Sequence, residues 1–431
     1  MKRKVIIAII FIAGSFPAIK AGNAITLEQC RQLALANNED MAQADNKYRQ
    51  AELDKDIAFA SYFPSVSGSL TALYAKDLDM MGTTLQMRGM YMAGLTLVQP
   101  LYAGGKIMAA NKMARIGVES LAESRRMTKA DIISRADNAY WSYIAVGEKV
   151  KLLETYAAQL EELTRQIEAS VEAQMATRND ALRVEAKRSQ ITYQLQKANN
   201  GKELCRMALC NIMGLPLDSI ILPADTNILV SPPVPMDATI DARPEYRLLQ
   251  NQVKLQEQQV KSARAEILPT LGVSAIYSYY GNIKMKGMAQ GYEYSEEFKD
   301  DFPLAVASLS IPILNWGKGI KGIKKAKLEL ENKRLELSKN ERLMNIELKQ
   351  AEQNITDGYN MINSSAVAVV QATENLRNMQ VNYDVGMCTL TDLLDAQAQW
   401  QEARSSQIEA ETQYKIYETE YLKVTGRLSP E

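Results

Sequence analysis

Apolar side chains recur at alternating spacings of four and three residues along two long segments of the chain. In the first segment these positions are Ile132, Ala136, Ala139, Tyr143, Val146, Val150, Leu153, Ala157, Leu160, Thr164, Ile167 and Val171. Such a repeat is typical of a coiled-coil seam and predicts a helix that supercoils against its neighbours. From about Lys106 to Val171 this helix would be roughly 100 Å long, so the sequence predicts an elongated molecule.

The second segment is a copy of the first. Pro100 and Pro312 are 212 positions apart, and the same shift relates Thr177 to Thr389. The shifted seam runs through Met344, Leu348, Ala351, Ile355, Gly358, Ile362, Ser365, Val369, Ala372, Leu376, Met379 and Tyr383. Between the copies, residues 216–244 contain six of the chain's 13 prolines, and proline cannot continue a helix.

This duplication predicts the domain organisation. Each copy should hold a β-hairpin and a helical hairpin, joined to the other copy by a proline-rich linker. The expected segments are a signal peptide at 1–24, a first repeat at 25–215 with a β-hairpin at about 64–101 and a helical hairpin at about 105–214, a linker at 216–243, and a second repeat at 244–431 with a β-hairpin at about 269–313 and a helical hairpin at about 317–426.

Each seam ends at a short break, after which a helix restarts. Thr177 and Asp180 follow the first break, and Thr389 and Asp392 follow the second. A threonine three residues before an acidic side chain has the spacing of a capping box, so both pairs predict the start of a returning helix. Each copy is therefore expected to contain an antiparallel helical hairpin with its tip at the break.

Between the proline landmarks the apolar period changes to two. Val66, Leu70 and Tyr74 share one face of a predicted strand, while serines and a threonine occupy the other face, and three further segments alternate similarly. A soluble sheet with one buried face is one interpretation, and a lipid-facing sheet is the other. Four strands are too few to close a membrane barrel, so a barrel would need several chains. The polar segments 77–88 and 283–301 are expected to be its extracellular tips.

The N-terminus favours export. Lys2, Arg3 and Lys4 precede an apolar run that ends near Ile19, a pattern typical of a secretory signal peptide cleaved after Ala24 or Ala21. A membrane anchor is the alternative, although the run is shorter than the ~20 residues of a spanning helix. The surroundings of Cys30 do not resemble a lipoprotein site, so no lipid is expected. Later in the chain no stretch approaches the length of a transmembrane helix.

Composition removes several function classes. Lysine and arginine total 50 against 51 acidic residues, so nothing favours binding to nucleic acid. The chain has no histidine, which removes the commonest general base and metal ligand, and an enzyme is not expected. No cofactor or resident metal is expected either. The 20 methionines leave export of soft metal ions open, with flexible apolar packing as the simpler interpretation.

Several motifs together resemble the TolC-type outer-membrane efflux proteins, also known as outer membrane factors. They are FPS at 63–65, LPT at 268–270, QPLYAGG at 99–105, IPILNWG at 311–317, RPE at 243–245 and YDVGMCTLTDLLDAQ at 383–397. The resemblance covers essentially the whole chain after residue 24. It implies a homotrimer with a 12-stranded β-barrel in the outer membrane, in contact with its lipid, and a 12-helix α-barrel in the periplasm. It also implies docking to a periplasmic adaptor protein and to an inner-membrane pump of the RND or ABC class.

The resemblance further assigns roles to four residues. Asp392 and Asp395 match paired aspartates that line the periplasmic entrance, and Tyr383 and Asp180 match residues that hold this entrance closed. Two positions depart from the family pattern, because Cys388 replaces an arginine and Gln174 replaces a glycine. Helix capping is the simpler interpretation of Asp180 and Asp392. The expected function is a passive exit duct for efflux or type I secretion, and the alternative is a soluble secreted coiled-coil protein.

Overall fold

The computed structural model describes residues 24–80, 83–225, 228–232, 238–289 and 292–428. The chain forms two compact units, each assembled from separate stretches of sequence. The first unit is made of residues 1–39, 129–237 and 350–423, and the second of residues 40–128, 238–349 and 424–431. The expected signal peptide lies outside the described residues, apart from Ala24.

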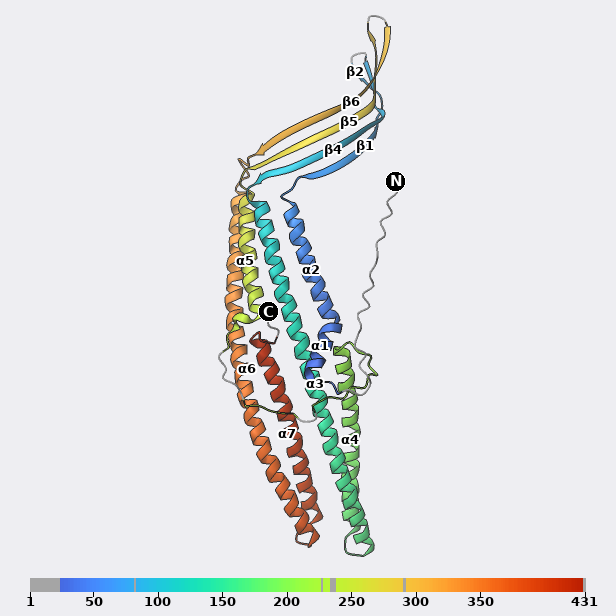
Figure 1. The fold of residues 1–431 in the computed structure, drawn as a ribbon, viewed down its shortest axis with the longest axis vertical. Coiled ribbons are helices and arrows are strands. Elements are labelled where there is room, and N and C mark those ends of the chain that lie inside the picture. The colour runs from blue at the N-terminus through green and yellow to red at the C-terminus, as the bar shows by residue number, and fades with distance from the viewer. Residues whose placement is uncertain (1–23, 81–82, 226–227, 233–237, 290–291, 429–431) are drawn as a thin grey trace, which may run out of the picture. The chain divides into compact units, whose positions relative to one another are not determined.

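The helices repeat in length as the sequence repeats (Figure 1). α3 and α6 contain 67 residues each, and α4 and α7, which follow them, contain 35 residues each. The described helices are α1 (Leu27–Asn37), α2 (Glu39–Ala60), α3 (Lys106–Glu172), α4 (Arg178–Ile212), α5 (Pro244–Ala265), α6 (Lys318–Asp384) and α7 (Leu390–Val424), with a 3-10 turn at Ile240–Ala242. None of these helices is long and apolar enough to cross a membrane.

The core of the first unit follows the predicted seam of α3. Its apolar positions are buried against α4 and the first turns of α7. The cluster at this end, called the tip core below, consists of Leu153, Tyr156, Leu160, Leu163, Ile167, Val184, Ile191, Leu390 and Leu393. Burying one large apolar side chain contributes about 1.5–3 kcal/mol, so the tip core is what fixes α7 against the α3–α4 hairpin.

An ion pair between a partly buried arginine and a fully buried aspartate anchors α1 in the same unit. Asp137 on α3 is fully buried, and both of its oxygens accept hydrogen bonds of 2.7 Å from the Arg31 guanidinium. The Thr419 hydroxyl of α7 donates a third bond, of 2.9 Å, to the same carboxylate. A buried charge is costly unless it is paired and fully hydrogen-bonded, and these three bonds meet that need. The cluster therefore holds α1, α3 and α7 together.

The second unit contains an antiparallel sheet. β1 pairs with β4, β4 with β5, and β5 with β6, so that β1 and β6 have free outer edges over this part of the sheet (Figure 1). A small hairpin, β2 with β3, continues the sheet by pairing β3 with the far part of β5. The strands are β1 (Ser65–Tyr74), β2 (Leu78–Met80), β3 (Thr83–Gln86), β4 (Arg88–Ala103), β5 (Thr270–Ala289) and β6 (Tyr292–Ser310).

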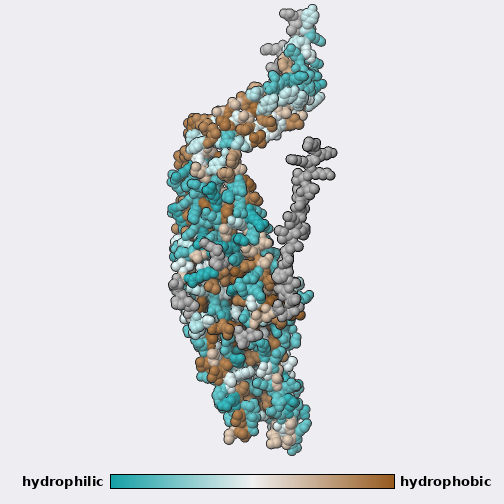
Figure 2. Space-filling model, in the orientation of Figure 1, coloured by the Kyte–Doolittle hydropathy of each residue, from teal (hydrophilic) through white to brown (hydrophobic). Residues whose placement is uncertain are grey.

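The strands extend further than the sequence predicts. The segment 283–301, expected as a polar tip, is strand almost throughout. β5 continues to Ala289, and β6 begins at Tyr292. An irregularity between Tyr280 and Ile283 shifts the register, which breaks the alternation that would mark a strand. Figure 2 shows brown apolar side chains over the strands nearest the helices and teal polar ones along this distal ribbon.

Candidate functional site

The turn from α3 to α4 forms the first helix tip. Gln174 adopts a left-handed φ of 60°, and the Met175 amide donates to the Ser170 carbonyl over 2.8 Å. The Thr177 hydroxyl caps α4 by accepting from the Asp180 amide, and the Asp180 carboxylate accepts in return from the Thr177 hydroxyl at 2.7 Å and the Thr177 amide at 3.2 Å. Both bonds stabilise the charged carboxylate and lower the pKa of Asp180, and the bond from the Thr177 hydroxyl has the larger effect.

The turn from α6 to α7 repeats this geometry. Gly386 has a φ of 74°, and the Met387 amide donates to the Asn382 carbonyl over 2.7 Å. The Asp392 carboxylate accepts from the Thr389 hydroxyl at 2.6 Å and from its amide at 2.9 Å. The same bonds lower the pKa of Asp392. Both aspartates therefore cap helices, as the threonine–aspartate spacing predicts.

Asp395 is different, because it caps nothing. It is exposed one turn further along α7 and lines an open groove of about 440 Å³, together with the cationic side chains of Arg183 and Lys187 from α4. The Arg183 guanidinium donates a 2.6 Å hydrogen bond to the Thr391 hydroxyl, and the structure records no ion pair to Asp395 among the described residues. The Asp395 carboxylate is thus left facing solvent. The sequence did not predict the contact between Arg183 and Thr391, since these residues are 208 positions apart.

Tyr383 lies at the end of α6 and packs against the tip core. Burial of its ring raises the pKa of the Tyr383 hydroxyl, and the negative charge of Asp180 raises it further. Among the described residues the structure records no hydrogen bond between the two side chains, and Asp180 is already bonded to Thr177. A closing contact between Tyr383 and Asp180 stays a prediction.

The sheet of the second unit has one continuous apolar face. Strand pairing aligns Val66, Leu97, Ala275 and Ala305 in one row, and cross-strand partners point to the same side of a sheet. The next row on this face is Gly68, Leu95, Tyr277 and Pro303. A large apolar face without a covering layer is unusual for a protein surface in water.

Comparison with known proteins identifies the family. The family model described as outer membrane efflux protein matches residues 30–214 and 237–427. The chain belongs to the outer membrane efflux protein family. The outer membrane efflux protein BepC of Brucella suis biovar 1 is 21% identical over 439 residues, which cover 99% of this chain and 91% of BepC.

Solved channels share the fold. The CmeC outer membrane channel of Campylobacter jejuni superposes with a TM-score of 0.78 at 18% identity, covering 97% of this chain and 91% of CmeC. The open-state MtrE outer membrane channel of Neisseria gonorrhoeae superposes with a TM-score of 0.76 at 17% identity, covering 93% of this chain and 88% of MtrE. The predicted fold class, long helical hairpins with a smaller β part, is confirmed. The outer-membrane efflux function is confirmed as well, and nothing supports the soluble coiled-coil alternative.

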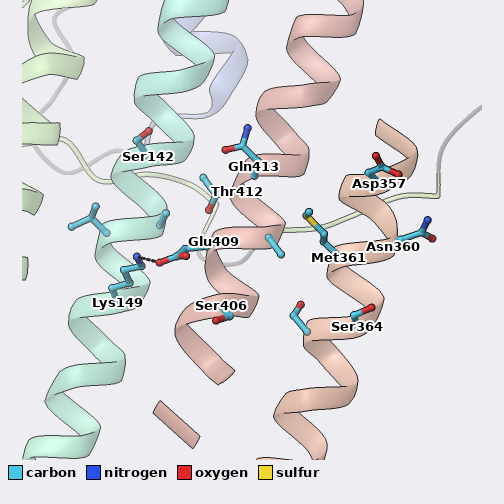
Figure 3. Close-up of a pocket in the computed structure, with 14 residues that line it drawn as sticks. Ser142, Lys149, Asp357, Asn360, Met361, Ser364, Ser406, Glu409, Thr412 and Gln413 are labelled. Atoms are coloured by element: carbon cyan, nitrogen blue, oxygen red, sulfur yellow. Dashed lines mark hydrogen bonds and ion pairs between the residues drawn. The ribbon is translucent and has the colours of Figure 1, made fainter. Parts of the chain in front are cut away.

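Efflux channels are not enzymes. A second open groove, of about 890 Å³, lies between α3, α6 and α7 (Figure 3), and its side chains form no catalytic arrangement. In this groove the Lys149 ammonium pairs with the Glu409 carboxylate over 2.6 Å, so the two charges neutralise each other. The carboxylate of Asp357, the amides of Asn360 and Gln413, and several hydroxyl and apolar side chains line the rest. Over the described residues, no group of three or more cysteine, aspartate or glutamate side chains could hold a metal ion.

Proposed function

We propose that three copies of this chain close into one channel across the outer membrane and act as a passive exit duct for an inner-membrane pump. The observation that carries this proposal is the sheet with two free edges, β1 and β6, and one exposed apolar face. Lipid offers no hydrogen bonds, and each unpaired backbone group there costs several kcal/mol. Pairing β6 of one copy with β1 of the next removes both of these free edges.

Strand length supports the same arrangement. β1 contains 10 residues, which is about the length that crosses a bilayer at a tilt of roughly 45°. The distal parts of β5 and β6 would then project beyond the lipid on the extracellular side. A periplasmic adaptor protein and a pump of the RND or ABC class would complete the system at the helix tips. The family model's two matched segments favour the repeats at 25–215 and 244–431 as the units of this design.

We assign the periplasmic entrance to the α6–α7 tip, with Asp392 and Asp395 as its selectivity residues. They are three positions apart on α7 and share a face, so threefold symmetry would stack them as two rings of carboxylates. Two unit charges ~8 Å apart interact by about 0.5 kcal/mol in water and about 2 kcal/mol at an effective dielectric of 20. Six such charges at a constriction favour cations and should bind multivalent cations tightly enough to block the pore.

The mature protein should carry no lipid on Cys30. This side chain is fully buried in α1, next to Arg31, which pairs with Asp137, and burial raises the pKa of its thiol to about 12. A diacylglyceryl group could not occupy that position without dismantling the cluster. Mass spectrometry of the purified mature chain should give a mass without a lipid, and an added acyl mass on Cys30 would contradict this assignment.

The first experiment tests the architecture. Native mass spectrometry of detergent-purified protein should show three copies, and reconstitution into planar bilayers should give discrete ion-conducting channels. A stable monomer that carries a folded sheet in the membrane, or a trimer without conductance, would overturn the proposed channel.

The second experiment tests the entrance. A trivalent cation added from the periplasmic side should block wild type, and the Asp392→Ala, Asp395→Ala double variant should resist the block. Arg183→Ala is the matched control, since it removes a charge from the same groove but no carboxylate, and it should remain blocked. Equal block of wild type and the double variant would place the cation site elsewhere. Tyr383→Phe tests closure, because loss of a closing bond to Asp180 should raise conductance in the absence of a pump.

A further inference from the structure

The register of the sheet also defines the face opposite to the lipid. Gly94 lies on that face, because a Cβ added there would lie 3.3 Å from the Ser69 hydroxyl and 3.5 Å from the Ser278 hydroxyl. Strand pairing adds the rows Ser67, Thr96, Ile276 and Leu304, and Ser65, Val98, Ser274 and Val306. Hydroxyl side chains dominate this face on β1, which suits a water-filled lumen. The opposite face of the sheet, with its continuous apolar rows, is the one that lipid would cover.

The strand β6 carries the longest apolar run on this face. Three successive positions of β6 on the lumen-facing side are apolar, Phe302, Leu304 and Val306, and their exposed fractions are 53%, 39% and 39%. Their partners on β5 are Ser278, Ile276 and Ser274, so Ile276 widens the apolar surface beside Leu304. We call Phe302, Leu304, Val306 and Ile276 the lumenal stripe. Alternate residues of a strand lie about 6.6 Å apart, so the three on β6 extend over roughly 13 Å.

A carboxylate lies at the outer end of the stripe. Asp300 pairs with Tyr280, and this pair continues the same face two residues beyond Phe302. Asp300 is exposed, and its carboxylate accepts a hydrogen bond of 2.9 Å from the amide of Asp301. Along the lumen wall of β6, an apolar surface is therefore followed directly by a negative charge.

We propose that this wall is a binding track for amphipathic organic cations, with the apolar body of the solute on the lumenal stripe and its positive group at Asp300. The inference rests on the proposed channel and names the class of solute that passes most favourably through it. Both parts of such a cation are complementary to the wall, since its apolar body buries area against Phe302, Leu304 and Val306 while its head reaches a carboxylate. Amphipathic anions would meet the same apolar surface but be repelled by Asp300.

The test uses block of single channels by alkyltrimethylammonium ions added from the extracellular side. Tetramethylammonium, hexyltrimethylammonium and octyltrimethylammonium share one head group and differ only in apolar length. Burial of a methylene stabilises binding by ~0.8 kcal/mol when it is complete, so one-sided contact should tighten block about twofold per carbon. Octyltrimethylammonium should therefore block wild type about fourfold more tightly than the hexyl compound, and octyl sulfate should block poorly.

Three variants separate the parts of the site. A triple variant with Phe302→Ser, Leu304→Ser and Val306→Ser should remove the dependence of block on chain length. If this variant inserts poorly into the membrane, Phe302→Ala alone serves instead and should reduce the dependence. Asp300→Asn should weaken block by each cation about fivefold, as expected for the loss of one charge near contact in water, and should strengthen block by octyl sulfate. Thr96→Ser, on the same face but outside the stripe, is the matched control and should behave as wild type.

The outcomes distinguish this inference from the proposed function. If wild type forms no conducting channel, the proposed function itself fails. If wild type conducts but hexyl and octyl compounds block it equally, or if block by the octyl compound survives both the triple and the Phe302→Ala substitutions, the track is overturned while the channel stands. Length-dependent block that is lost in the stripe variants and kept in Thr96→Ser supports the track.

Discussion

The two helix tips of the first unit have the same backbone but different charges. Both turn through a left-handed residue, Gln174 in one and Gly386 in the other, and both restart with a threonine–aspartate capping box. One helical turn further on, the first copy has Arg183 where the second has Asp395. Duplication has thus preserved what folds a tip, and the charges on it have diverged. A capping aspartate is a structural requirement, whereas a second aspartate on the same face is available for function.

The tips also differ in what supports them. The tip core takes most of its side chains from α3 and α4, and α7 contributes only Leu390 and Leu393 at its first turns. The start of α7, which carries both proposed entrance carboxylates, is therefore held by the hairpin of the other copy. We expect the first hairpin to behave as the rigid partner and the second tip to depend on it.

The largest effect is expected from Leu393→Ala. Leu393 is fully buried in the tip core, and truncating a buried leucine costs about 2–5 kcal/mol because a cavity remains. The loss should fall mainly on α7 and appear as faster amide hydrogen exchange of its first turns, measured by mass spectrometry. The control is Leu182→Ala on α4, where the side chain is 54% exposed and the change should be slight. Equal acceleration of α4 and α7 would contradict the dependence of the second tip on the first hairpin.

The sequence was sufficient for the parts of the fold that depend on neighbouring residues. The seam of α3 and both capping boxes were predicted from spacing, because residues three or four apart on a helix determine them. The contacts among Arg31, Asp137 and Thr419 could not be predicted in this way, since 106 and 282 positions separate Asp137 from its two partners. The distal ribbon of β5 and β6 was missed because a register shift and many charged residues hide its alternation. The lumenal stripe could not be predicted, because assigning its residues to one face requires the register of four strands, and no single segment of sequence contains that register.

A smaller effect is expected at the left-handed turn residues. Gly386→Ala places a Cβ at a φ of 74° and should destabilise the second tip by about 1 kcal/mol, whereas Gln174→Gly relieves the same strain and should stabilise the first tip by up to about 1 kcal/mol. Hydrogen exchange at each turn measures both. Gly147→Ala is the control, because Gly147 lies within α3 with open space around it and should gain about 0.5–1 kcal/mol from alanine. If Gly386→Ala were neutral, the two turns would not share one strained geometry.

The smallest expected effect is a dependence of stability on pH, and it should be the same at both tips. The pKa values of Asp180 and Asp392 are lowered by their bonds from Thr177 and Thr389, so each carboxylate stabilises its tip above the unfolded pKa of roughly 3.9 and loses this contribution as the pH falls through its lowered folded value. Thr177→Val and Thr389→Val remove the hydroxyl bonds. Hydrogen exchange at the start of α4 or α7 should be faster in the variants at neutral pH, and the difference from wild type should shrink below about pH 4.

Asp395→Asn, which removes an exposed carboxylate that caps nothing, should show no such pH dependence. A pH-dependent change in Asp395→Asn matching that of Thr389→Val would mean that Asp395 is also structural, and it would remove the distinction between Asp392, which also caps α7, and Asp395, which does not.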